Sequence, residues 1–202
     1  LGTGPSLDKV PVKAFQALTR RHTFGVNTLL AYGRLQAPTT FYCVAESGWL
    51  EGISIPMLIE RLRKLPSLRF YAHHWPLEGL ADWIYVPYNS GAHIERGDFQ
   101  GIEPGFSYVA NGRSVVCMAM QLACYFGFKD IYLLGVDATR NGHAKGLDYG
   151  KWEKTRGRQD AFIRAISAAH EAMRAGGRNL VNLSAGGDLE IPRMCLEDVL
   201  ER

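Results

Sequence analysis

The sequence lacks the patterns that mark several familiar classes of protein. Its four cysteines show no C-x-x-C spacing, so we expect free thiols, no zinc site and a reducing, cytoplasmic location. Its apolar runs fall far short of the roughly 20 residues that a membrane helix needs, and no signal peptide is visible. The net charge of +3 is too small to indicate a nucleic-acid partner. The composition that remains, 47% hydrophobic and 21% charged, is typical of a globular domain.

No internal repeat or low-complexity linker divides the 202 residues, so we expect a single domain over residues 1–202. Short β-like runs alternate along it with longer helical ones. The predicted strands are 23–26, 39–45, 68–72, 83–86, 131–134 and 179–183, and the predicted helices are 9–20, 56–62, 115–126 and 160–175. The alternation predicts a doubly wound, Rossmann-like α/β fold, with a mostly parallel sheet and helices on both faces.

Two segments lack a regular pattern. Residues 87–112 are rich in glycine, asparagine, serine and proline, and we expect an irregular loop there. Residues 138–150 hold three glycines and His143, which can carry a proton or bind a leaving phosphate. We expect this second loop to be mobile and to close over a ligand. Most histidines in loops are simply solvated, so His143 can also be a bystander.

The chain opens on a glycine-rich turn, Leu1-Gly2-Thr3-Gly4-Pro5-Ser6. Two glycines let a ligand approach the backbone, and a helix that starts beside them directs unpaired N–H groups at an anion. The turn therefore suits a nucleotide phosphate, although a plain strand-to-helix connection has the same pattern. The third glycine of the dinucleotide fingerprint is replaced by Leu7, which disfavours NAD or FAD. Only Leu1 is left of the strand that should precede the turn, so we expect that strand to be truncated.

Three further polar residues follow predicted strands or begin a helix, where ligands bind in open α/β sheets. Asn27 suits a base edge or a ribose hydroxyl, and is otherwise a turn residue. Asp137 suits Mg²⁺ or general-base chemistry, and is otherwise a cap. Ser114, in the turn 111–114, suits an anion, and is otherwise only the cap of the following helix.

Three segments, 2–7, 24–27 and 127–137, together resemble one superfamily. It is the Rossmann-like family that includes archaeal 6-hydroxymethylpterin diphosphokinases and flagellin-modifying motility accessory factors. More distantly, the chain is similar to bacterial sialyltransferases that use CMP-sialic acid. The resemblance implies that a nucleotide is bound by Asn27 and by the glycine turn (Gly2, Thr3, Gly4 and Ser6). It also implies that Ser114 lies near the donor sugar or phosphates.

Three hypotheses follow. The first is a glycosyltransferase-like enzyme of surface-glycan assembly, which takes a nucleotide-sugar donor and a small-molecule or glycan acceptor and activates the acceptor with Asp137 or His143. The second is a diphosphokinase acting on a pterin-like alcohol, in which Asp137 holds Mg²⁺. The third is a degenerate member that only binds a nucleotide or a partner. The observation that supports this third hypothesis is that residues 155–160 lack the histidine base of the sialyltransferases.

Overall fold

The structure is a computed structural model that describes residues 1–32, 34, 39–45, 60, 67–72, 83–139, 144 and 156–201. The strands in this part of the chain are β1 (Phe24–Val26), β2 (Phe41–Val44), β3 (Leu68–Tyr71), β4 (Trp83–Tyr85), β5 (Tyr88–His93), β6 (Val109–Asn111), β7 (Asp130–Leu133) and β8 (Asn179–Asn182). The helices are η1 (Pro5–Lys9), α1 (Val12–Leu18), η2 (Asn27–Ala31), η4 (Ile94–Arg96), α3 (Val115–Tyr125), α4 (Arg156–Ala175) and α5 (Leu196–Leu200). None of these helices is both long and apolar enough to cross a membrane.

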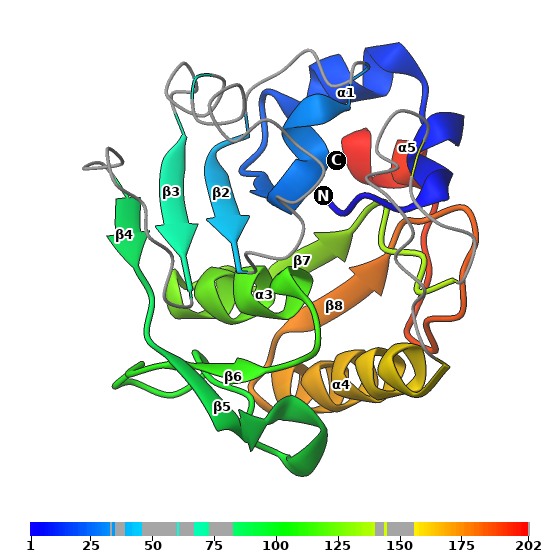
Figure 1. The fold of residues 1–202 in the computed structure, drawn as a ribbon. Coiled ribbons are helices and arrows are strands. Elements are labelled where there is room, and N and C mark those ends of the chain that lie inside the picture. Colours follow the sequence, from blue (N-terminus) through cyan, green and yellow to red (C-terminus); the bar gives the residue numbers. More distant parts are fainter. Residues whose placement is uncertain are drawn as a thin grey trace.

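Every pairing between the described strands is parallel. Strands β1 to β4 form one sheet in their sequence order, while β5 pairs with β6 and β7 with β8. The first residues of the chain join two of these sheets. The nitrogen of Leu1 donates to the Phe24 carbonyl (2.7 Å), and that of Gly2 donates to the Leu134 carbonyl (2.8 Å). The chain therefore leaves the centre through β1 to β4 on one side and returns through β7 and β8 on the other (Figure 1).

Helices cover both faces of this arrangement. On one face, α3 and α4 pack on a core that includes Val26, Cys43 and Phe70 from the strands. On the other face, η1, α1, η2 and α5 enclose a second core around Phe15 and Leu29. Buried parallel strands between two helical layers define a doubly wound α/β domain. The predicted fold class is thus confirmed.

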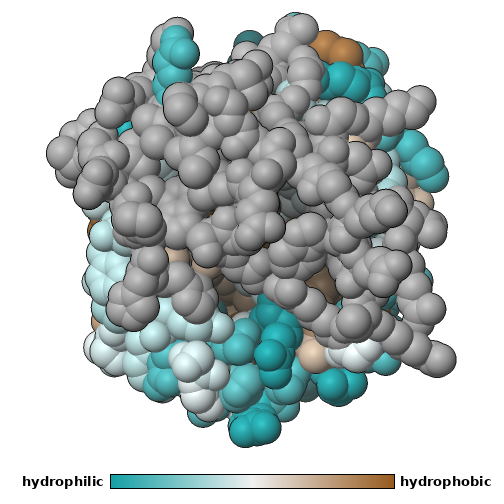
Figure 2. Space-filling model, in the orientation of Figure 1, coloured by the Kyte–Doolittle hydropathy of each residue, from teal (hydrophilic) through white to brown (hydrophobic). Residues whose placement is uncertain are grey.

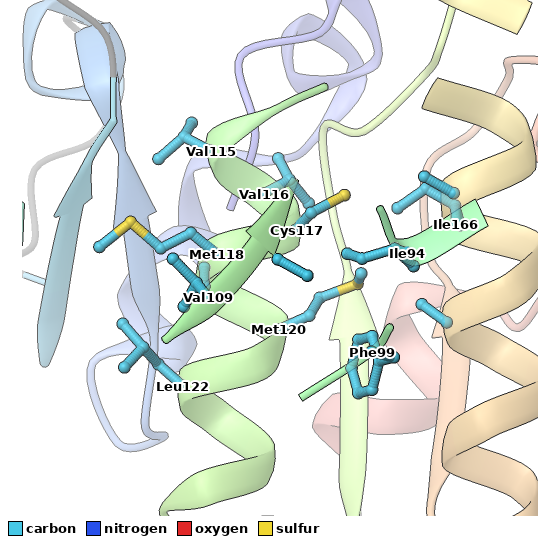
Figure 3. Packing of buried hydrophobic residues seen from close by; sticks show 14 of the residues in the cluster. Ile94, Phe99, Val109, Val115, Val116, Cys117, Met118, Met120, Leu122 and Ile166 are labelled. Atoms are coloured by element: carbon cyan, nitrogen blue, oxygen red, sulfur yellow. The ribbon is translucent and has the colours of Figure 1, made fainter. Parts of the chain in front are cut away.

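Helix α3 lies at the centre of the first core and is almost entirely buried. Ser114 caps its first turn by accepting a hydrogen bond from Val116 N (3.3 Å), as the sequence predicts, and ten of its eleven residues are buried. Figure 3 shows Met118 and Met120 on different sides of the helix, with Met120 near Phe99. A central helix that is apolar around its circumference is expected to be enclosed in this way.

Aromatic rings hold the far end of α3 against the sheet. Phe24 and Phe41, the first residues of β1 and β2, lie 4.5 Å apart between ring centroids, and Phe41 lies 5.3 Å from Phe126, just after α3. The C-terminal end of α3 therefore lies where β1 and β2 begin. Val116, in the first turn of α3, lines the same cavity as Val26, the last residue of β1.

The predicted irregular loop at 87–112 is wrong in part, because it contains β5, η4 and β6. Within β5 the Asn89 side chain accepts hydrogen bonds from Gly91 N (3.0 Å) and Ala92 N (3.2 Å), and the pairing with β6 shifts register. This irregularity removes the alternating pattern that marks a strand. Figure 2 shows hydrophilic residues at the edge of the molecule where β5 and η4 lie.

The other element predictions differ at their ends. The predicted helix 9–20 is η1 followed by α1, and the late helix begins at Arg156. The short helices η2 and α5 were not predicted. The predicted helix 56–62 lies outside the described residues.

Candidate functional site

The candidate site lies at the edge where the parallel strands end, and the glycine turn lies against it. Gly4 N donates to the Gly135 carbonyl (2.7 Å), just beyond β7. A Cβ atom on Gly4 would lie 2.5 Å from Asp137 Oδ2, and one on Gly2 would overlap the Gly135 carbonyl. The carbonyl of Thr3 accepts a hydrogen bond from Ala144 N (2.9 Å). Glycine is therefore required here for backbone packing, independently of any ligand.

Asp137 meets the turn directly. Ser6 N, in the first turn of η1, donates to Asp137 Oδ2 (2.7 Å), although the two residues are 131 positions apart. Both residues are 5% exposed. The carboxylate thus occupies the position at the start of η1 where the sequence suggests a phosphate. Two candidates that the sequence assigned to different roles are in contact.

This contact leaves two polar atoms without a partner. The other carboxylate oxygen, Asp137 Oδ1, and the hydroxyl Ser6 Oγ are both buried and have no hydrogen-bond partner among the described residues. An unpaired buried polar group costs roughly 1–3 kcal/mol. Such groups therefore mark a place that a ligand can satisfy.

Backbone strain is concentrated at the same edge. Within the described part of the chain, the non-glycine residues with positive φ are Asn27 (φ 42°), Arg113 (φ 64°) and Ala138 (φ 50°). Each lies shortly after a strand, namely β1, β6 and β7. Left-handed backbone at residues other than glycine costs energy and gathers at functional sites. The strain therefore marks the same edge as the unpaired polar atoms.

Asn27 ties the end of β1 to its neighbour. Its Oδ1 accepts a hydrogen bond from Ala45 N (3.4 Å), and its main-chain carbonyl accepts one from the Tyr42 hydroxyl. The same hydroxyl accepts from Leu30 N (3.2 Å), which fixes η2. Asn27 is half-buried and structurally engaged. Binding of a base or ribose through its amide remains a prediction.

The turn before α3 is a second backbone feature of this edge. Arg113 N donates to Asn111 Oδ1 (2.9 Å), and Ser114 Oγ is engaged in capping the helix. Arg113 is exposed. Its guanidinium and the first N–H groups of an eleven-residue helix can both meet an anion.

Residues that sequence reasoning missed hold the Asp137 turn in place. Val136 N donates to Ser184 Oγ (3.0 Å), and Asp188 N donates to the Asp137 carbonyl (2.9 Å). Gln159 Nε2, from α4, donates to the Ala138 carbonyl and to Asp188 Oδ2, the latter at 3.3 Å. The sequence Gly186-Gly187-Asp188 is typical of a tight turn after a strand, and it could have been used to predict this supporting segment.

Arg193 stabilises the segment 184–188, which supports Asp137. Its guanidinium donates to the carbonyls of Ser184 (3.4 Å), Gly186 (3.3 Å) and Gly187 (2.6 Å). Gly187 has φ 97°, and a Cβ atom there would overlap the Asp137 carbonyl. The position of the carboxylate therefore depends on packing between two loops.

Two further sequence candidates concern the loop after Asp137 and a metal. His143 lies outside the described residues, as does most of the predicted lid 138–150. The described residues contain no group of three or more histidine, cysteine, aspartate or glutamate side chains able to hold a metal. Asp137 is the carboxylate that the sequence proposes for Mg²⁺. An ion held there would draw its other ligands from substrate phosphates and water.

Comparison with known proteins bears on the fold. No family model matches the chain, and no curated protein matches it. Among solved structures, the chain is similar to a Maf glycosyltransferase from Magnetospirillum magneticum AMB-1, with a TM-score of 0.58 and 18% sequence identity. The match covers 97% of this chain and 33% of that one, so the chain spans about a third of the length of the structure it resembles. The similarity supports the Rossmann-like α/β fold and agrees, in fold, with the motility accessory factors named above.

Proposed function

We propose that the protein is a glycosyltransferase-like enzyme that binds a nucleotide-sugar donor at the strand-end edge. The observation that carries the proposal is the buried pair Ser6 Oγ and Asp137 Oδ1, neither with a partner among the described residues. A hydroxyl donor beside a carboxylate acceptor suits a donor phosphate beside an acceptor hydroxyl. The Maf structure, named as a glycosyltransferase, supports the same class.

In this proposal the residues have separate tasks. The Ser6 hydroxyl donates to a donor phosphate, and Asn27 contacts the nucleoside. The exposed Arg113 guanidinium balances phosphate charge. Asp137 Oδ1 accepts the proton of the acceptor hydroxyl, whose oxygen forms the new bond to the anomeric carbon while the bond to the donor phosphate breaks. The nucleotide leaves with that electron pair.

A thermal-shift screen of CMP, UDP, GDP and ATP, each with and without Mg²⁺, tests the binding step. A ligand at a hundredfold excess over its Kd stabilises the folded state by about 2.7 kcal/mol, which is a Tm rise of roughly 5–10 °C at this size. Ser6→Ala should reduce the rise. Its matched control is Ser167→Ala, because that hydroxyl donates to the Ile163 carbonyl within α4 (3.2 Å). No shift with any nucleotide would overturn the proposal.

The same screen separates the other two hypotheses. A rise with ATP that requires Mg²⁺, and not with CMP, UDP or GDP, supports a diphosphokinase in which Asp137 holds the metal. A rise in Tm with a nucleotide shows binding. If incubation with sugar donors then releases no free nucleotide, the result supports a protein that only binds a nucleotide. Release of nucleotide that increases with an added acceptor supports the transferase.

A further inference from the structure

Four of the six large hydrophobic side chains exposed within the described residues gather on one part of the surface. They are Leu68 (54% exposed), Tyr125 (53%), Ile84 (45%) and Phe126 (40%), and together they are called the apolar patch below. Single exposed apolar residues are ordinary, whereas a contiguous group marks a surface that another body covers. We propose that the apolar patch, with the basic residues beside it, binds reversibly to the surface of an anionic lipid bilayer.

The strand register places the patch on the face of the sheet that carries α3. Leu68 pairs with Phe41, and paired residues of parallel strands point to the same side. In the same way Ile84 pairs with Phe70. The Phe126 ring lies 5.3 Å from the Phe41 ring and 5.7 Å from the Phe70 ring, between centroids. Leu68, Ile84 and Phe126 therefore belong to one continuous surface.

This surface is exposed because α3 covers only part of the sheet. The main contacts of α3 with the four-stranded sheet are with β1 and β2, and β4 is its outer strand (Figure 1). Tyr125 is the last residue of α3, and its ring lies 5.7 Å from Phe126 and 4.8 Å from Phe106. The aromatic rings at the end of α3 thus extend the bare face of β3 and β4.

Positive charge adjoins the patch at the edge where the strands begin. The Arg21 carbonyl accepts a hydrogen bond from Thr40 Oγ1 (3.4 Å), and the Thr40 carbonyl accepts one from Leu68 N (3.1 Å). Arg21 therefore lies two hydrogen bonds from the patch, and Arg20 and Arg21 are both exposed. A pair of exposed cations thus flanks the patch on this side.

Further cations lie beyond the end of α3. Arg178 Nη2 donates to the Cys124 carbonyl (3.5 Å), directly before Tyr125. The exposed Lys129 follows Phe128, whose ring lies 6.2 Å from Phe41. The described residues of this edge include the cations Arg20, Arg21, Lys129 and Arg178 and the acids Glu103 and Asp130. The charge beside the patch is therefore positive on balance.

This combination fits a bilayer better than a second copy of the chain. Aromatic and aliphatic side chains flanked by lysine and arginine are typical of surfaces that lie in the membrane interface, and an anionic leaflet attracts each cation. Two copies that met through the patch would bring their cations together, which is unfavourable. At about half exposure, four such side chains offer roughly 400 Å², about half of what each partner of a stable dimer buries.

Sedimentation with lipid vesicles tests the proposal on the 202-residue chain. We expect binding to vesicles of phosphatidylglycerol and phosphatidylcholine in equal parts to be at least about tenfold stronger than to phosphatidylcholine alone. Salt at about 1 M, where the Debye length is about 3 Å, should weaken it. The candidate site lies at the opposite edge, where the strands end, and no nucleotide is present in the assay. The result is therefore independent of the proposed function.

Substitutions separate the patch from the rest of the surface. Arg20→Gln and Arg21→Gln should each lower the apparent vesicle affinity about fivefold, and Tyr125→Ser should lower it at least about fivefold. The matched controls are Val12→Ser, at an exposed apolar residue of α1, and Arg164→Gln, at an exposed cation of α4. Both controls should bind within about twofold of the unsubstituted chain.

All of these side chains are exposed, so Tm should stay within about 2 °C of the unsubstituted chain and shows that each variant is folded. Equal losses for the patch variants and the controls would overturn the proposal. Equal binding to both kinds of vesicle, or binding to neither, would do the same. A dimer that Tyr125→Ser disperses, without vesicle binding, would assign the patch to a second copy of the chain instead.

Discussion

At the scale of single residues, the candidate site is built on the contact between Ser6 and Asp137. It joins the start of the chain to the segment after β7, and it buries two polar atoms that have no partner in the described structure. A buried, half-satisfied polar pair destabilises the fold unless something completes it. A substitution can therefore separate the contribution of this contact to the free energy of unfolding from its contribution to ligand binding and turnover.

Asp137→Asn is the substitution that separates them. An amide oxygen can still accept from Ser6 N, so we expect the free energy of unfolding to fall by no more than about 1.5 kcal/mol. Turnover should fall at least about 100-fold if the carboxylate is the base. Asp98→Asn is the control, because Asp98 Oδ2 accepts from His93 N (2.8 Å) within another loop. Unchanged turnover, with binding intact, would make Asp137 a structural cap.

Gly4→Ala tests the close approach of the glycine turn. The added Cβ would lie 2.5 Å from Asp137 Oδ2 and 2.8 Å from the Gly135 carbonyl. Since a backbone atom is one of the two, the loop must shift, and we expect a loss of about 1–3 kcal/mol in urea unfolding together with loss of nucleotide binding. Gly186→Ala is the matched control, because a Cβ there meets no atom within 4 Å. Equal stability of the two variants would contradict this geometry.

The sequence predicts the candidate site in part. Gly2, Gly4 and Asp137 can be found because glycines and a carboxylate beside apolar strands are local signals. Ser184, Gln159 and Arg193 cannot be found in the same way, because each acts through contacts with residues distant in sequence. The direct contact of Ser6 with Asp137 was also not predicted, since it depends on where the chain's first turn meets β7.

At the scale of elements, α3 depends on one polar residue. Gln121 is fully buried, and its Oε1 accepts from Ala110 N (2.9 Å) and Gln100 N (3.2 Å). Its Nε2 donates to the carbonyls of Ala110 (3.1 Å) and Cys117 (3.0 Å). This side chain thus attaches β6 and the segment before it to the central helix. The sequence analysis predicted a helix over 115–126 and did not predict this attachment.

Gln121→Leu should therefore cost more than an ordinary core substitution. The leucine leaves the buried Ala110 N and the partly buried Gln100 N without their acceptor, and an unpaired buried group costs roughly 1–3 kcal/mol. We expect a total loss of about 2–5 kcal/mol in urea unfolding. Met118→Leu, a substitution of similar volume in the same helix, should cost less than about 1.5 kcal/mol. Similar losses for the two variants would show that β6 does not depend on Gln121.

The element predictions succeed where a hydrophobic run is continuous and fail where a side chain interrupts the pattern. α3 and β7 were located to within a residue or two, since both are strongly apolar. β5 was missed, because Asn89 bonds to its own strand and because the exposed Ser90 and Gly91 resemble a loop. The short helix α5 has only five residues, too few for a period to be read.

At the scale of the whole molecule, the fold divides into two cores on the two faces of the sheet. The first core holds three free thiols, Cys43, Cys117 and Cys124, and the fourth thiol, Cys195, is exposed before α5. Burial raises the pKa of Cys43 and Cys117 well above the usual range, and raises the pKa of Cys124 to about 11. The carboxylate of Glu197 raises the pKa of Cys195 by accepting its S–H.

These thiols report whether the first core opens as one unit. Only the thiolate reacts with iodoacetamide, so at pH 8 we expect the folded protein to label at Cys195 alone, and slowly. The other three should label together at the rate of global unfolding, because β2 and α3 share one core. Pulse labelling with mass spectrometry along a urea series measures this, and Glu197→Gln, which removes the carboxylate beside Cys195, should speed only the first site. Labelling of Cys43 before Cys117 and Cys124 would show instead that the four-stranded sheet separates from α3 before the rest of the domain unfolds.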